Sequence, residues 1–417
     1  MRDVAVTGRL RDGPGDGRRA YLDHAATTPL RPEVAAAMAD LHGAGAGDGA
    51  VLGNPTGSHP PAQRARRLLE EARDEVAAFV GRDPGDIVFT SGGTESANLA
   101  FLGPAEAARQ DRGEAVLLSS AVEHPAVREA ARAAAKAGLD TRELPVDSNG
   151  IVDPDALART LSSRVTIVAI MLANNETGVI QPLPELIETI NLQAPNAYVF
   201  TDAVQAAPYI DLAEVTAGAD LVSLSAHKVG GPVGVGALAI SGRVVLQPRQ
   251  YGGGQERERR SGTQDVVGAV GLATALRLVS AERATAALRV AALRDRLRDG
   301  LLRAVPGAYR TVPAAAGVDV LPGHLHLCVP GVEREELLVA LGEEDVCVSG
   351  GSSCASGALQ PSHVLSAMGV APELAAGALR FTLGYGTTEA DVDRALAVVP
   401  VVVAALRRDT RPADPAG

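Results

Sequence analysis

The segment Leu224-Ser-Ala-His-Lys-Val-Gly-Gly-Pro232 brings a hydroxyl, an imidazole and an amine together where an apolar run ends. The run before it, residues 219–225, is predicted to form a strand. The glycines allow the backbone to pass close to a ligand. Ser225 and His227 could donate hydrogen bonds to a phosphate, and Lys228 offers a primary amine. A glycine-rich surface turn with a solvated lysine is the alternative interpretation.

Lys228 is one of only two lysines in the chain, the other being Lys136, because arginine supplies almost all of the basic residues. Arginine is always protonated and cannot form an imine, whereas a deprotonated lysine can. Lys136 lies in a helical stretch, residues 128–137, and is interpreted as a solvated surface residue. Lys228 follows a predicted strand in a glycine-rich turn, so its amine is the candidate for imine chemistry.

Short apolar runs alternate with helical segments through the first two thirds of the chain. Helical periodicity covers residues 61–80, 123–137 and 184–192. Alternating strands and helices predict a largely parallel sheet that helices cover on both faces, the α/β fold class. The predicted strands are residues 86–90, 115–119, 165–172, 198–202, 219–225 and 235–240.

The pattern changes after about residue 280. A long helix rich in Ala, Leu and Arg runs to about residue 305, and a smaller α+β set follows. We therefore predict a large cofactor-binding domain over residues 36–284 and a small domain made of residues 1–35 and 285–417. Residues 1–19 are interpreted as a disordered leader, because no apolar stretch marks a secretory signal.

Composition excludes several classes of protein. The net charge is −11 and no basic tract occurs, which argues against stable nucleic-acid binding. No uninterrupted apolar run reaches the roughly 18 residues of a membrane span. The three cysteines, Cys328, Cys347 and Cys354, form no disulfide framework and indicate a reducing, cytoplasmic location.

Two further predicted strands end in polar or small residues. Thr90-Ser-Gly-Gly-Thr94 ends one strand and begins a helix, whose free N–H groups favour a phosphate; an ordinary capped turn is the alternative. Asp202 ends another apolar strand, where a carboxylate needs a cationic partner such as a protonated pyridine nitrogen. A helix N-cap is the alternative for Asp202.

His124 and Asn175 follow two more strands. An imidazole could stack on an aromatic cofactor or move protons, although a lone histidine is more often structural. A phosphate cradle, a carboxylate for a ring nitrogen, an amine and a histidine together match pyridoxal phosphate better than any nucleotide. The chain also lacks a Walker lysine motif, and its Gly252-Gly-Gly-Gln segment lacks the context of a dinucleotide loop.

With these motifs the sequence resembles the class V aminotransferase group and, within it, the cysteine desulfurases. The resemblance runs from Tyr21-Leu-Asp-His-Ala-Ala-Thr-Thr-Pro29 to Leu379-Arg-Phe-Thr-Leu-Gly384, nearly the whole chain. It also includes Gly53-Asn-Pro-Thr-Gly-Ser-His59, Asn174-Asn-Glu-Thr-Gly178 and Arg260-Ser-Gly-Thr263. It implies pyridoxal-phosphate transferase fold type I, with a mainly parallel seven-stranded sheet flanked by helices and a smaller α+β domain.

The resemblance also implies a role for each motif residue. Lys228 would carry the Schiff base to the cofactor, Asp202 would pair with the pyridinium nitrogen, and His124 would stack on the ring. Arg380 would bind the substrate carboxylate through its bidentate fork. Thr263 would reach the phosphate in the partner subunit of a homodimer. The remaining implied contacts are Gly93, Thr94, Ser225 and His227 to the phosphate, Gln205 to the ring hydroxyl, and Asn175 to that hydroxyl and the substrate.

Cys354 distinguishes a desulfurase from the rest of the group. Ser349-Gly-Gly-Ser-Ser-Cys354-Ala-Ser-Gly357 resembles the segment that carries the nucleophile, and its small residues should leave it mobile. A mobile thiolate can take sulfur at the cofactor and deliver it elsewhere. The implied reaction converts L-cysteine to L-alanine and leaves a persulfide on Cys354. The acceptor stays open: an iron–sulfur scaffold, tRNA thiolation, DNA modification or a biosynthetic pathway.

Two positions depart from the family pattern: Ser353 replaces the usual Ala before the nucleophile, and Val233 stands where Lys is common. Neither removes a catalytic group. A selenocysteine lyase, a C–S lyase of the same fold, and a non-catalytic sulfur-assembly scaffold are the rival interpretations. His324-Leu-His-Leu-Cys328 places three possible metal ligands on one strand face, but no fourth ligand is evident and no metal site is predicted.

Overall fold

A computed structural model describes residues 19–41, 52–313, 318–351 and 362–409. Their Cα packing divides the chain into two compact units. The larger unit comprises Thr27–Asn174 and Ile180–Arg283, and the smaller one Met1–Ala26, Asn175–Val179 and Ala284–Gly417. The structure thus assigns Asn175–Val179 to the smaller unit, whereas the sequence placed it in the large domain. The domain division at residues 36 and 284 stays a prediction.

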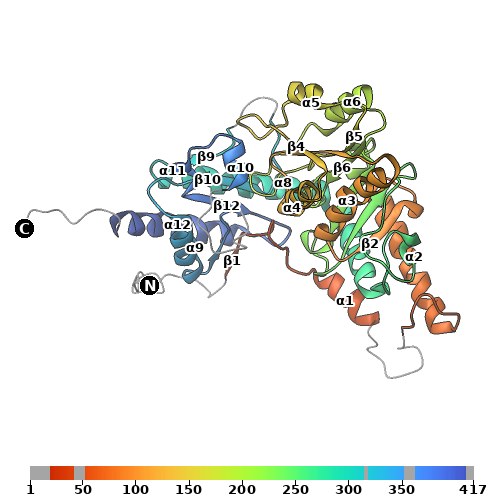
Figure 1. The fold of residues 1–417 in the computed structure, drawn as a ribbon. Helices are drawn as coiled ribbons and strands as arrows, with labels where there is room; N and C mark the ends of the chain where they lie inside the picture. Colours follow the sequence, from red (N-terminus) through yellow and green to blue (C-terminus); the bar gives the residue numbers. More distant parts are fainter. Residues whose placement is uncertain (1–18, 42–51, 314–317, 352–361, 410–417) are drawn as a thin grey trace, which may run out of the picture. The chain divides into compact units, whose positions relative to one another are not determined.

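A seven-stranded sheet forms the centre of the larger unit (Figure 1). Its strand order is β2-β8-β7-β6-β5-β3-β4, and every neighbouring pair from β7 to β4 is parallel. Only β8 runs against its neighbours, so the sheet is mixed but mainly parallel, which confirms the predicted fold class. The strands are β2 (Ile87–Thr90), β3 (Val116–Ser120), β4 (Asp140–Leu144), β5 (Val165–Ala169), β6 (Tyr198–Asp202), β7 (Leu221–Ser225) and β8 (Gly236–Ile240).

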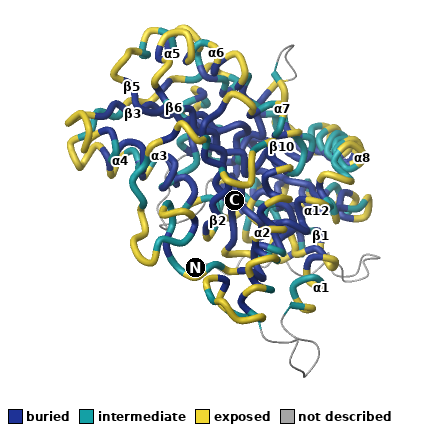
Figure 2. The backbone as a smooth tube through the Cα atoms, turned by 90° about the vertical axis from the view of Figure 1, so that its right-hand side faces the viewer, coloured by how far each residue is buried: buried dark blue, intermediate teal, exposed yellow. Residues whose placement is uncertain are grey.

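The sequence correctly located six of these strands because each is an apolar run. All five residues of β3, β5, β7 and β8 are buried, as expected for strands covered on both faces. The seventh strand, β4, escaped prediction because its sequence, Asp-Thr-Arg-Glu-Leu, carries one large apolar residue. β4 lies at the sheet edge, where exposed polar side chains are tolerated. Figure 2 shows β3 and β6 in the colour of buried residues.

Helices cover this sheet. α3 packs against β5, β6, β7 and β8, and α4 packs against β3 and β4 (Figure 1). α2 begins after the N-cap His59 and ends at Gly81, which adopts a left-handed φ of 66° suited to glycine. The helices of the larger unit are α1 (Pro32–Leu41), α2 (Pro60–Val80), α3 (Gly93–Arg112), α4 (Pro125–Lys136), α5 (Pro154–Thr160), α6 (Leu183–Gln193), α7 (Leu212–Val215) and the first part of α8 (Val266–Ala304).

The smaller unit is an α+β structure. An antiparallel sheet has the order β12-β10-β9, and a parallel pair joins β1 to β11. Helix α12 packs against α9, β1 and β11. The elements are β1 (Ala20–Tyr21), β9 (Tyr309–Arg310), β10 (His324–Cys328), α9 (Arg334–Glu343), β11 (Val346–Cys347), α10 (His363–Ala367), α11 (Pro372–Ala375), β12 (Ala378–Thr382) and α12 (Glu389–Asp409).

The described helices include none that is both long and apolar enough to cross a bilayer.

Candidate active site

The carboxyl ends of β2 and β7 meet at Gly236. Thr90, the last residue of β2, and Ser225, the last of β7, both pair with this glycine in β8. A side chain at Gly236 would place its Cβ 2.6 Å from Gly92 Cα and 2.6 Å from the Leu224 oxygen. Gly236 therefore has to be a glycine, because the loop after β2 folds back onto it.

That loop leaves the N-terminus of α3 open to a ligand. The N-cap, Gly92, has a φ of 139° that other residues rarely adopt, and it provides no side-chain cap for the helix N–H groups. A Cβ on Gly92 would lie 3.7 Å from Ser225 Oγ, so this hydroxyl faces the loop. Uncapped N–H groups of Gly93 and Thr94 with a nearby hydroxyl form the donor set that suits a phosphate.

Asp202 lies at the end of the neighbouring strand, β6. It is buried, and its Oδ1 accepts hydrogen bonds from the Val204 N–H and from Ser223 Oγ, both at 3.0 Å. No α-helix starts there, so the helix N-cap interpretation is wrong. Oδ2 accepts no hydrogen bond from the described residues. A buried carboxylate with one oxygen left over favours a cationic partner.

His124 is the N-cap residue of α4, and its Nδ1 accepts the Ala126 N–H at 3.1 Å. The neutral ring therefore carries its proton on Nε2. Burial lowers the pKa of His124; the negative charge of Asp202 opposes this and the positive charge of Lys228 adds to it. Lys228 lies in a short 3-10 turn, Ala226–Lys228, directly after β7. The structure thus brings His124, Asp202 and Lys228 within electrostatic reach of one another.

The other predicted contacts of this unit are Gln205, His227 and Thr263. Gln205 is buried in the turns after β6. His227 contacts Thr27 Oγ1 through Nδ1 at 3.1 Å, and burial together with the charge of Lys228 lowers its pKa to about 4. His227 is therefore neutral near pH 7 and carries a single ring N–H. Thr263 is exposed, next to the start of α8.

Sequence reasoning gave Glu123 no role, although it precedes His124. Glu123 is fully buried, and its Oε1 accepts both Ser120 Oγ at 2.7 Å and the Met171 N–H at 2.6 Å. It therefore ties the end of β3 to the chain that follows β5. Burial raises the pKa of Glu123 to about 8, against the two hydrogen bonds and with the help of the Asp202 charge.

The raised pKa predicts a pH dependence of stability. Between the ordinary pKa of 4.5 and the native value of about 8, the folded chain keeps a proton on Glu123 that the unfolded chain has lost. Below pH 4.5, Glu123 contributes its full share to the free energy of unfolding. As the pH rises from there through about 8 this contribution is lost, and the loss at pH 7 is roughly 3 kcal/mol. Glu123→Gln keeps the Oε1 acceptor and cannot ionise, so we expect a flatter profile in urea unfolding.

A matched control for this measurement is Glu106→Gln on α3, because Glu106 is a surface residue that pairs with Arg109. Its profile should follow that of the parent chain. An unchanged pH slope in Glu123→Gln would show that Glu123 ionises in the folded chain much as it does in water.

In the smaller unit, Arg380 and Asn175 lie together. Arg380 on β12 is buried; its Nη1 donates to the Asn175 oxygen at 2.7 Å and its Nη2 to Asp23 Oδ1 at 2.7 Å. The Arg380 Nε has no hydrogen-bond partner among the described residues. The guanidinium therefore keeps a donor for a carboxylate. Asp23 is a partner that sequence reasoning missed, although it stands in the quoted Tyr21-Leu-Asp-His motif.

The alternating strand β10 places His326 and Cys328 on one face, as predicted. Thr311 Oγ1 contacts His326 Nδ1 at 2.7 Å and Cys328 Sγ at 3.4 Å, so a hydroxyl joins the two side chains. Across the part of the chain that the structure describes, no cluster of three His, Cys, Asp or Glu side chains could hold a metal ion. Cys354, the predicted nucleophile, and Ser353 lie outside the described residues.

The larger unit fits a phosphorylated pyridine aldehyde. An uncapped helix N-terminus with Ser225 beside it suits the phosphate, and the remaining Oδ2 of Asp202 suits a protonated ring nitrogen. Lys228 is the only described amine side chain besides Lys136, which lies at the far end of α4.

Comparisons with known proteins agree with this site. The aminotransferase class-V family model matches residues 20–395. The cysteine desulfurase IscS of Dictyoglomus turgidum is 40% identical over 390 residues, covering 94% of this chain and 96% of that protein. An IscS-like cysteine desulfurase of Mycobacterium tuberculosis is 40% identical over 396 residues, or 93% of this chain and 97% of the relative.

Solved structures agree as well. One titled NifS-like protein has a TM-score of 0.84 and 32% sequence identity, covering 93% of this chain and 100% of the other. The fold, the site residues and nearly full-length similarity lead to one assignment. The chain belongs to the class V aminotransferases and, within them, to the cysteine desulfurases, a family of pyridoxal-phosphate enzymes.

Proposed function

We propose that the chain removes sulfur from L-cysteine, releases L-alanine, and holds the sulfur as a persulfide on Cys354 before transfer to an acceptor. The observation that carries the proposal is that His124, Asp202 and Lys228 lie at the carboxyl ends of parallel strands, where open α/β sheets bind ligands, and that the charges of Asp202 and Lys228 shift the pKa of His124. The family resemblance and the motif around Cys354 support the choice of cysteine as the substrate.

Lys228, Asp202 and His124 each have a distinct task. Pyridoxal phosphate, when bound, forms a Schiff base with an amine and draws electrons from the neighbouring substrate carbon. Lys228 would hold the cofactor, and its amine could move a proton at the substrate carbon. Asp202 keeps the ring nitrogen protonated by offering a carboxylate oxygen. His124 would lie against the ring, and its hydrogen bond from the Ala126 N–H fixes the plane of the imidazole.

The phosphate contacts come from several chain segments. We assign Gly93, Thr94, Ser225 and His227 to the phosphate of the same protomer, and Gln205 and Asn175 to the ring hydroxyl. The support is the uncapped start of α3 and the close approach of Ser225 to Gly92. Backbone N–H groups and neutral side-chain donors can bind the phosphate without a lysine, so Lys228 stays available for the imine.

Arg380 selects a substrate with a carboxylate. Its guanidinium is held by Asn175 and Asp23 and has a remaining donor in Nε. The Asp23 partner lowers the net charge around Arg380, so the positive charge alone would attract anions weakly. Hydrogen-bond geometry then contributes more to selection, because a planar carboxylate can match the guanidinium fork.

The sulfur step uses Cys354. Its thiolate attacks the sulfur of the bound cysteine, and a new S–S bond forms as the substrate C–S bond breaks. The electron pair of the broken bond passes to the substrate carbon, which Lys228 or another acid then protonates to give alanine. The persulfide that remains can be attacked by the thiol of an acceptor.

Product analysis tests the reaction. The full-length chain with pyridoxal phosphate, L-cysteine and a reductant should yield alanine and sulfide in equal amounts. Pyruvate and ammonia in place of alanine would instead identify a C–S lyase. Bound cofactor with no turnover of cysteine or selenocysteine would identify a non-catalytic scaffold, and selenocysteine turnover alone a selenocysteine lyase.

We also propose a homodimer in which Thr263 reaches the cofactor phosphate of the partner subunit. The exposure of Thr263 in a single chain supports this, since its assigned task then lies outside its own protomer. Sedimentation at the mass of one chain would contradict the dimer. The acceptor we propose is a protein of iron–sulfur cluster assembly or tRNA thiolation, in the cytoplasm, and a trapped mixed disulfide with Cys354 would identify it.

A further inference from the structure

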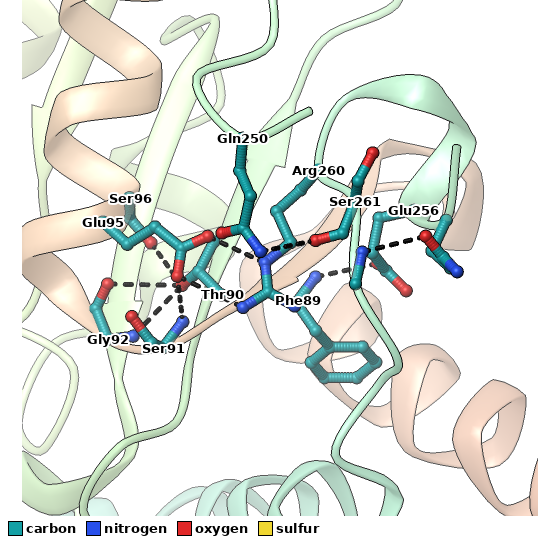
Figure 3. A network of polar contacts seen from close by, with 12 residues as sticks. Phe89, Thr90, Ser91, Gly92, Glu95, Ser96, Gln250, Glu256, Arg260 and Ser261 are labelled. Atoms are coloured by element: carbon teal, nitrogen blue, oxygen red, sulfur yellow. Dashed lines mark hydrogen bonds and ion pairs between the residues drawn. The ribbon is translucent and has the colours of Figure 1, made fainter. Parts of the chain in front are cut away.

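A partly buried ion pair lies beside the proposed phosphate site. Arg260 Nε donates to Glu95 Oε1 at 2.8 Å, and the other oxygen, Oε2, accepts the Ser91 N–H at 2.7 Å. Figure 3 shows Glu95 between these two partners, directly above the Gly92 turn. Both side chains are largely shielded, with 17% of Arg260 and 22% of Glu95 exposed. The family resemblance and the cofactor chemistry assign neither residue a role.

Glu95 creates an electrostatic conflict at this place. It is the third residue of α3, so its carboxylate lies within the first turn of the helix whose N-terminus would bind the phosphate. Burial by itself raises the pKa of Glu95, but the hydrogen bonds from Arg260 and Ser91 outweigh burial and the pKa falls below its ordinary value. Glu95 is therefore ionised at neutral pH. An unneutralised carboxylate would repel a phosphate dianion, because water screens the two charges only in part at this partly buried place.

The chain holds Arg260 in place without any help from a ligand. Gln250 Nε2 donates to the Ser261 oxygen at 2.7 Å, and the Gly262 N–H donates to Gln255 Oε1 at 2.8 Å. Upstream, Glu256 is fully buried and forms a two-oxygen pair with Arg73 at 2.7 and 2.9 Å.

The pair between Glu256 and Arg73 stabilises an unusual backbone conformation. Glu256, Arg257 and Glu258 have φ values of 47°, 56° and 64°, in the left-handed region that favours glycine. Such a turn persists only where surrounding contacts specify it. The buried Arg73 pair and a hydrogen bond from the Phe89 N–H to Glu256 Oε2 at 2.9 Å provide those contacts. Arg260 therefore reaches Glu95 from a rigid loop.

We propose that Arg260 is a positioning residue that neutralises Glu95, so that the first turn of α3 can accept the cofactor phosphate while Glu95 keeps the Ser91 turn in shape. The inference rests on the proposed cofactor function of this site. It also explains why a carboxylate is tolerated at the proposed phosphate site: Glu95 organises the turn, and Arg260 removes the electrostatic cost.

The test is a double-mutant cycle on the full-length chain stripped of cofactor. Binding of pyridoxal phosphate is measured by the absorbance of the lysine-bound cofactor in the parent chain, Arg260→Gln, Glu95→Gln and the double variant. Arg260→Gln should weaken binding about tenfold or more, since it leaves Glu95 unneutralised. Glu95→Gln should bind at least as tightly as the parent, and the double variant should return to within about threefold of it.

Pyridoxal without its phosphate is the second probe. Because the conflict involves the phosphate alone, Arg260→Gln should bind pyridoxal as the parent chain does. Arg260→Lys, which keeps the positive charge, should restore most of the affinity for pyridoxal phosphate. Glu106→Gln, which breaks the exposed pair with Arg109 on the same helix, is the matched control and should change neither affinity.

Three results would overturn the proposal. A double variant as weak as Arg260→Gln would make Arg260 a direct phosphate ligand. Equal losses for pyridoxal and pyridoxal phosphate would make it a structural anchor only. Unchanged affinity of Arg260→Gln for pyridoxal phosphate would show that the Glu95 carboxylate does not repel the phosphate. A parent chain that binds no pyridoxal phosphate would instead refute the proposed function.

Discussion

Lys228→Ala is expected to abolish the visible absorbance of lysine-bound pyridoxal phosphate and to remove cysteine turnover. No other amine in the described residues lies with Asp202 and His124, so no side chain can replace it as the point of attachment. The loss of its proton transfer alone should cost roughly 10²- to 10⁴-fold in rate, and the loss of attachment should add to this. Spectra between about 300 and 500 nm, recorded beside a sulfide assay, measure both effects.

The chain itself offers the matched control, since it has only one other lysine. Lys136 is the last residue of α4 and is exposed. Lys136→Ala should keep the absorbance and the activity of the parent chain. Retained absorbance in Lys228→Ala, or its loss in Lys136→Ala, would mean that the Schiff-base lysine is wrongly assigned.

Cys354→Ala is expected to keep the cofactor spectrum and to lose sulfide release in the presence of a reductant. The proposed cofactor contacts do not include this thiol, so binding should survive. No persulfide can form without the thiolate, and the substrate sulfur then has no nucleophile to receive it. Spectra, alanine formation and sulfide release should all be measured on the same sample.

Cys347→Ala is the control for this experiment. Cys347 is half-buried on β11, and burial raises the pKa of its thiol, so it forms a thiolate less readily. Its loss should leave sulfide release intact. Full sulfide release by Cys354→Ala would exclude the persulfide route, and loss of the cofactor spectrum would show that the substitution disturbs the fold.

The core of the sheet was predictable because buried parallel strands are apolar along their whole length. The sequence located β5, β6 and β7, and with them Asp202 and Lys228. β4 could not be found in this way, because an edge strand can be polar and this one is. Its pairing with β3 is a non-local contact that leaves no periodic pattern in the sequence.

The partners of the site residues were harder to predict than the residues. Asp23 and Arg380 are 357 positions apart, yet they form an ion pair. Glu123 precedes His124 and reads as an ordinary charged residue until its burial is known. Burial and long-range contacts decide whether a carboxylate is a solvated surface group, a group that keeps its proton at neutral pH, or a counter-ion. The spacing of residues in the sequence shows neither the burial nor the contacts.

Residue types along the chain were enough to indicate the cofactor chemistry, since a scarce lysine, a strand-end Asp202 and a glycine-rich turn are chemical requirements carried by residue type. They also indicated the desulfurase reaction through Cys354. The electrostatic setting became visible only in the folded chain: Asp23 beside Arg380, Arg260 beside Glu95, and a buried Glu123 with a pKa of about 8. The reason is physical. Side-chain identity fixes which bonds a group can form, whereas its charge and proton affinity depend on how folding removes water and brings distant charges together.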